Sequence, residues 1–246
     1  SLFKTVLDTP QTQEIRQDLR WLQSHLGPAR DAEVFVREIL DPVTPVFAEV
    51  PGFSELRQQF IARQQGLLEM ARALPEQPRF TQTLLSLSRW AEGGDWLRQA
   101  NQPSNISNNQ TVSDFARTAL TKRDRQIGKA MLRLDKMAES ERHELRIKIK
   151  KLRYSIDFFG SIFHANRAKR SSVALGLVQD RLGLLNDIAV ARQILQRQAD
   201  ENGTVQSSWV AGMIAGWHSA QTKELLRQAA LDWKGYARLP RFWTED

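Results

Sequence analysis

Apolar residues recur at spacings of three and four residues along almost the whole chain, which is the period of an amphipathic α-helix. No run alternates β-branched or aromatic residues with polar ones between hairpin turns, as a half-buried strand would. The sequence therefore predicts an all-α fold. Its 246 residues, 41% of them hydrophobic, can form one or two domains with a buried core.

Glycine, proline and polar residues mark the predicted helix ends. The longest predicted loop is Asn101 to Ser113, and Thr111-x-x-Asp114 near its end resembles a capping box for a helix that should continue to about Ala138. The loop divides the chain into a first half of about residues 1–110 and a second half of about residues 111–246. Further breaks are predicted at Gly27-Pro28, Pro42, Pro45, Pro51-Gly52, Pro75, Pro78, Gly93-Gly94 and Asn202-Gly203.

Several classes of protein are excluded by composition. The chain has no Cys, so it has no disulfide framework, no thiolate metal site and no cysteine nucleophile. No apolar run approaches 18 residues, and the first 30 residues contain no apolar segment of signal-peptide length. We therefore expect a protein without a membrane partner, located in the cytoplasm.

Positive charge is concentrated in one segment. Residues 122–153 contain 12 Lys and Arg against five Asp and Glu, a balance of +7 that equals the net charge of the whole chain. The sequences before and after this segment have balances of −2 and +2. A local positive field of this size attracts a polyanion.

The centre of this segment, HELRIKIKKLRY from His143 to Tyr154, predicts a helix with two functional faces. The apolar stripe consists of Leu145, Ile149, Leu152, Ile156 and Phe159. The cationic stripe, about 120° away around the helix, consists of His143, Arg146, Lys150 and Arg153. Ser140 is the predicted N-cap, and Lys148 and Lys151 should lie outside the cationic stripe.

A solvated helix face is the simplest interpretation of such a charge run. Exposed helices, however, usually mix signs so that Glu and Lys pair at a spacing of four residues. Between Arg142 and Arg153 there are six Lys and Arg residues and only Glu144 as an acid. Because like charges at these spacings repel, the pattern favours an anionic partner.

The string from His143 to Tyr154 resembles the signature of the CHAD family, the conserved histidine α-helical domain. LGPARD at 26–31 and LGLLND at 182–187 are 156 residues apart, and a helix break is predicted at each. Both strings resemble further family features and suggest two related halves. The resemblance implies one domain over residues 1–246, with two pseudo-symmetric halves of the four-helix-bundle type around a basic channel. It also implies that the first family helix, which should carry a second basic segment, is missing from this chain.

Binding of inorganic polyphosphate without catalysis is the function that the resemblance implies, as a targeting or accessory module associated with polyphosphate granules. Arg offers phosphate a fork of donors, Lys offers a compact charge, and His143 should bind an anion better when protonated. Tyr154 orients an Arg, donates its hydroxyl or packs at an interface. The expected polyphosphate-binding residues are His143, Arg146, Lys150, Arg153, Tyr154, Lys151, Arg133 and Lys129. Structural support, as caps and carboxylates beside arginines, is expected from Arg30, Asp31, Asn186 and Asp187.

Catalytic and metal sites are not expected. A helical zinc pair HExxH would need a second His where Ile147 stands, and neither a phosphate-binding GxxxxGK[ST] loop nor a GxSxG nucleophile motif occurs. No cofactor is expected either.

Nucleic-acid binding without sequence specificity is the main competing function, because backbone binding is also electrostatic and the same charges would serve it. The basic segment is also compatible with an accessory domain of a triphosphatase whose catalytic domain is outside this chain. Contact between the basic face and an acidic protein is a third function that the charge pattern allows.

Overall fold

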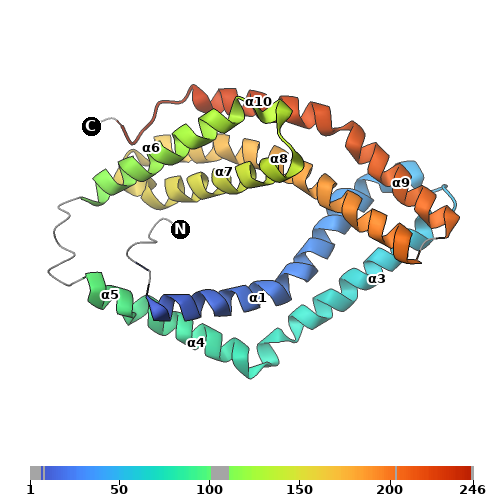
Figure 1. The fold of residues 1–246 in the computed structure, drawn as a ribbon, viewed down its shortest axis with the longest axis horizontal. Coiled ribbons are helices and arrows are strands. Elements are labelled where there is room, and N and C mark those ends of the chain that lie inside the picture. Colours follow the sequence, from blue (N-terminus) through green and yellow to red (C-terminus); the bar gives the residue numbers. More distant parts are fainter. Residues whose placement is uncertain (1–6, 8, 101–110, 203, 245–246) are drawn as a thin grey trace. The chain divides into compact units, whose positions relative to one another are not determined.

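The computed structural model describes residues 7, 9–100, 111–202 and 204–244, and within these ranges it is built from helices with no strand, as predicted (Figure 1). The chain divides into two compact units, Ser1–Asn109 and Gln110–Asp246. This division lies beside the predicted boundary between halves, whereas the assignment of both halves to one domain stays a prediction. Among the described residues, no helix is long and apolar enough to span a membrane.

The first unit is a set of helices packed around α1 (Pro10–Val34), which contacts α3 (Phe53–Arg72) and α4 (Pro78–Gly93). Thr9 caps α1 by accepting a hydrogen bond from the Thr12 amide at 3.1 Å, and the Trp90 indole donates to the Thr12 hydroxyl at 2.9 Å. The remaining elements are η1 (Phe35–Leu40), η2 (Asp41–Val43), α2 (Thr44–Phe47), η3 (Leu74–Glu76) and α5 (Asp95–Ala100).

The second unit is organised around the long helix α8 (Ala165–Asn202). It packs against α7 (Glu139–Phe159), α9 (Val205–Ala220) and α10 (Thr222–Ala237), and α6 (Val112–Met131) packs on α7 (Figure 1). Two short turns, η5 (Leu134–Lys136) and η6 (Gly160–Ile162), flank α7. The core of this unit consists of fully or almost fully buried side chains, among them Leu120, Ile127, Leu145, Ile149, Leu175, Val178, Ile214 and Trp243.

The two breaks predicted at the LGxx[RN]D strings are wrong. Helix α1 continues through Gly27-Pro28, and α8 continues through Gly183. Proline removes one helical hydrogen bond but its fixed φ suits a helix, and the helix continues because buried residues such as Ala29 and Phe35 follow it. Arg30, Asp31, Asn186 and Asp187 therefore lie inside helices, and the prediction that they cap a following helix is wrong for all four.

The start of α6 confirms the predicted capping box. The Thr111 hydroxyl accepts from the Asp114 amide at 3.1 Å, and the Asp114 carboxylate accepts from the Thr111 amide at 3.3 Å. Of the predicted loop, residues 101–110 lie outside the described residues, and Val112 and Ser113 are already helical. Helix α6 ends at Met131, earlier than the predicted end near Ala138, and the chain turns through η5 before α7 begins.

A polar cluster holds the C-terminal segment on α6. Asp124 accepts from the Tyr236 hydroxyl at 2.8 Å and from Arg241 Nε at 2.9 Å. The Trp243 indole donates to the Thr121 hydroxyl at 3.1 Å. The Arg241 guanidinium also lies over the Tyr236 ring, 4.7 Å from its centroid. Tyr236, Phe242 and Trp243 are buried, so this segment is part of the core of the second unit.

Alkaline pH should weaken this cluster through Tyr236. Burial raises the pKa of the Tyr236 phenol, with the nearby Asp124 charge acting in the same direction. Because the pKa in the folded state exceeds the unfolded value of about 10, this stability is complete below about pH 10 and is lost as the pH rises further. Urea unfolding at pH 8 to 11 should show a steeper alkaline loss for the wild type than for Tyr236→Phe. Parallel pH profiles would contradict this expectation.

Candidate functional site

Helix α7 begins two residues earlier than predicted. The N-cap is Ala138, whose amide donates to the Glu141 carboxylate at 2.8 Å, so Ser140 lies inside the first turn rather than at the cap. The predicted apolar stripe is confirmed, since Leu145, Ile149, Leu152, Ile156 and Phe159 are each at most 1% exposed. This burial fixes the rotation of α7 and hence the direction of the cationic stripe.

The cationic stripe of α7, defined by His143, Arg146, Lys150 and Arg153, lies along α8. His143 contacts Asn186, the Arg146 side chain lies against Gly183, and the Arg153 side chain lies against Gly176. Each step forward along α7 matches an equal step backward along α8, so the two helices are antiparallel with a fixed register. The same register places Lys150 opposite Gln179.

The two glycines of α8 provide room for the arginines. A Cβ at Gly183 would lie 3.5 Å from Arg146 Nε, and a Cβ at Gly176 would lie 3.7 Å from an Arg153 guanidinium nitrogen. Longer side chains at these positions would displace the guanidinium groups. The seven-residue spacing of the glycines equals that of the arginines, which is two helical turns. Both guanidinium groups can therefore lie close to the α8 backbone.

No described carboxylate is paired with the cationic stripe. Within the described ranges, Arg146, Lys150 and Arg153 form no ion pair, and the Nε atoms of both arginines are buried without a hydrogen-bond partner. Two acids of α7 pair with other cations, since Glu144 lies 4.0 Å from Lys148 and Glu139 binds Arg192 at 2.8 Å. Buried donors and unpaired cations are costly, so the stripe is suited to an anionic ligand rather than to water alone.

His143 is held in a defined orientation. Its Nδ1 lies 2.5 Å from Asn186 Oδ1, while Asn186 Nδ2 donates to Asp187 Oδ1 at 3.4 Å. Because the carboxylate takes the amide nitrogen, the amide oxygen faces the ring, and Nδ1 must carry a hydrogen to donate. Asn186 and Asp187 thus support the site by orienting His143 and not by capping a helix.

Tyr154 is 55% exposed and lies beside Lys150, whose ammonium is 5.6 Å from the ring centroid. The contact found for its ring is with a lysine rather than an arginine, and its predicted roles stay predictions. A cation–π contact of this kind orients the Lys150 side chain along the stripe.

The other predicted binding residues lie away from the stripe. Lys151 is exposed on α7 outside it. Lys129 is exposed on α6, one turn beyond Arg125, and Arg133 is exposed between α6 and η5. No contact joins these three side chains to the stripe among the described residues. Their predicted role in binding stays a prediction.

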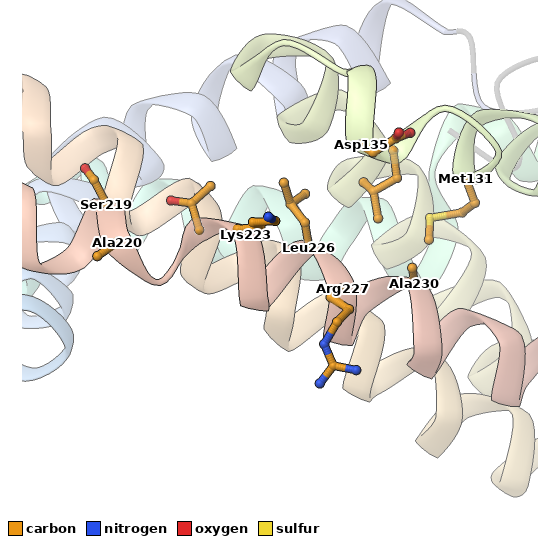
Figure 2. A pocket seen from close by; sticks show the side chains of 10 residues that line it. Met131, Asp135, Ser219, Ala220, Lys223, Leu226, Arg227 and Ala230 are labelled. Atoms are coloured by element: carbon orange, nitrogen blue, oxygen red, sulfur yellow. The ribbon is translucent and has the colours of Figure 1, made fainter.

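Sequence reasoning missed a hollow of about 620 Å³ in the second unit (Figure 2). It lies between the end of α6 with η5 and the α9–α10 corner, and its wall combines Met131, Leu134 and Leu226 with Lys223. Arg227 at its edge is paired with Glu224 at 2.6 Å. None of the cationic stripe contributes to it. Within the described ranges, no group of three or more His, Asp and Glu side chains is placed to hold a metal ion.

In the part of the chain that the structure describes, an all-helical fold presents a row of cations without acidic partners, which defines a class of helical domains with a basic surface. The comparison with family models is more specific: residues 1–196 match the CHAD domain, so the chain belongs to the CHAD domain family, as the motif from His143 to Tyr154 predicted. The match includes the α7 stripe and the α8 residues that meet it. No curated protein and no solved structure matches the chain.

Proposed function

We propose that this protein binds inorganic polyphosphate through the cationic stripe of α7, without catalysis, as a targeting or accessory module. The observation that carries the proposal is the row of Arg146, Lys150 and Arg153, which has no acidic partner among the described residues although Glu139 and Glu144 are on the same helix. We also propose that the stripe lines a basic channel of the domain and that the protein acts in the cytoplasm.

The geometry suits a flexible chain of phosphates. His143 and Arg153 are ten residues apart, so the stripe is about 15 Å long at 1.5 Å per residue. Successive phosphate groups of one chain can therefore meet the imidazole, the two guanidinium groups and the ammonium in turn. A guanidinium fork and a phosphate form charge-assisted hydrogen bonds, which are about twice as strong as neutral ones.

Binding rather than hydrolysis fits the residue types of the stripe. Arg146, Lys150 and Arg153 carry cationic groups that donate hydrogen bonds and stabilise negative charge, but in that state they cannot accept a proton from water. His143 Nδ1 already faces Asn186. The proposed role is therefore to hold the phosphate chain, and any triphosphatase activity would belong to a separate domain.

Nucleic-acid binding is the second candidate, because the exposed Tyr154 ring beside Lys150 could stack on a base. Phe158, one turn beyond Tyr154 on α7, is 62% exposed, and Trp209 is 57% exposed on α9. Tyr154 and Phe158 both follow Arg153, so among the described residues no exposed aromatic lies between the cations of the stripe from His143 to Arg153. Stacking along a strand needs aromatics interleaved with the cations, so the stripe favours a ligand without bases.

A competition experiment separates these two functions. The protein is bound to a labelled DNA duplex in moderate salt and titrated with long-chain polyphosphate, and the amounts of both polymers are expressed as phosphate concentration. We expect polyphosphate to displace the duplex well before the two phosphate concentrations match. Retention of the duplex when the phosphate concentrations are equal would overturn the proposal and favour the nucleic-acid function.

A further inference from the structure

Helix α6 carries a second row of cations that the α7 stripe does not include. Lys122, Arg125 and Lys129 are exposed and spaced by three and four residues, so they share one face of the helix. The buried residues of α6, among them Ala116, Leu120 and Ile127, lie on the opposite side. This row, here called the α6 row, therefore faces away from the core of the second unit.

A groove of about 600 Å³ lies along the α6 row. Its other wall is the C-terminal segment at Thr244, which is fixed in place by the hydrogen bonds from Trp243 to Thr121 and from Arg241 to Asp124. The groove is therefore built from two ordered elements and not from one helix face alone. Its lining residues are Arg117, Thr118, Thr121, Lys122, Arg125, Gln126 and Thr244.

The charged residues that line this groove in the described structure are all cationic. No Asp or Glu lines it, and Lys122, Arg125 and Lys129 form no ion pair with any described residue. The one acid of this stretch of α6, Asp124, points to the other side and is taken by Arg241 and Tyr236. Like charges at spacings of three and four residues repel, so the row gains from an anionic ligand just as the α7 stripe does.

The polar groups of the groove match phosphate oxygens. Thr118 contributes a hydroxyl beside the two cations, and the Thr121 hydroxyl accepts from Trp243 while keeping its own hydrogen to donate. No aromatic ring is among the lining residues, so the groove offers a base nothing on which to stack. A phosphate chain without bases fits this surface better than a nucleic acid does.

We propose that the α6 groove is a second, separate polyphosphate-binding site, with Lys122 and Arg125 as its main contacts and Lys129 extending it. This inference rests on the proposed function for the class of ligand. Under this proposal Lys129 binds polyphosphate at the α6 groove, whereas the sequence predicted that it binds together with the residues of the α7 stripe. One long polyphosphate molecule that engages both sites binds more tightly than a short one, because the second contact is intramolecular.

Tripolyphosphate titrations test the number of sites. Isothermal titration of the wild type should give two tripolyphosphate molecules per chain, and K122Q/R125Q should give one. The matched control is K169Q/R170Q, which removes the same charge from exposed positions of α8 and should keep two. One molecule per chain for the wild type and the same stoichiometry for K122Q/R125Q would overturn the second site.

Long polyphosphate provides an independent measurement. K122Q/R125Q should bind it about tenfold more weakly or worse, with a salt dependence reduced by about two units in slope, since two phosphate contacts are lost. R146Q/R153Q keeps the α6 groove intact. If that variant binds tripolyphosphate like the wild type while K122Q/R125Q loses it, the α7 proposal fails and the α6 site stands. Unchanged long-chain binding by K122Q/R125Q overturns the α6 site alone.

Discussion

The double variant R146Q/R153Q is expected to weaken binding of tripolyphosphate at the α7 stripe by at least about 100-fold. Each guanidinium lies against a glycine of α8 and forms no hydrogen bond or ion pair with another described residue, so its terminal N–H groups, rather than the buried Nε, remain available to the ligand. A hydrogen bond to a charged group contributes about 1.5–3 kcal/mol, and two lost contacts of this strength correspond to that factor or more.

The matched control for this variant is K136Q/K148Q, which removes two charges from exposed positions in the same basic segment. Lys148 is already 4.0 Å from Glu144, and Lys136 belongs to the η5 turn. Isothermal titration of both variants at several salt concentrations should show a large loss of affinity only for R146Q/R153Q. Equal losses would mean that the whole segment attracts the anion through diffuse charge, and that the stripe is not a binding site.

The two faces of α7 could be predicted from sequence because both are local properties. Leu145, Ile149 and Leu152 follow the helical period, and burial of that stripe leaves only one direction for Arg146 and Arg153. The period needs no knowledge of the rest of the fold. The N-cap was predicted less well, because residue type alone favoured Ser140. The helix begins after Ala138, whose amide donates to the Glu141 carboxylate.

The partner surface on α8 could not be predicted in this way, because it depends on the register of two antiparallel helices. Gly183 looked like a helix break and lies instead in the middle of α8, where it accommodates Arg146. One signal was present in the sequence. Gly176 and Gly183 have the same spacing as Arg146 and Arg153, which indicates matched positions on neighbouring helices.

Long-range polar contacts were also beyond local sequence patterns. Asp124 is one acid among several basic residues, and nothing near it in sequence indicates Tyr236 or Arg241 as partners more than 100 residues away. Because Asp124 points toward Tyr236 and Arg241, it does not lie beside Lys122, Arg125 and Lys129 on the solvent side of α6. The cationic character of the α6 groove is therefore a consequence of tertiary packing.

Replacement of Asp124 by alanine should lower the free energy of unfolding of the second unit by about 3 kcal/mol. The variant leaves the Arg241 guanidinium, whose side chain is 25% exposed, and the buried Tyr236 hydroxyl without their acceptor. Breaking a buried ion pair by removing one partner typically costs about 3–5 kcal/mol, and the partial exposure of this pair favours the lower end. The expected fall in Tm is roughly 10 °C.

Thermal and urea unfolding of D124A should be compared with D180A, which removes an exposed acid of α8 with no partner among the described residues and should change stability by less than about 0.5 kcal/mol. Equal stability of the two variants would show that the Asp124 cluster does not hold the C-terminal segment. Because that segment forms one wall of the α6 groove, folded D124A at low temperature should also bind tripolyphosphate more weakly at the α6 groove. Binding at the α7 stripe should stay unchanged, since no contact of Asp124 reaches Arg146 or Arg153.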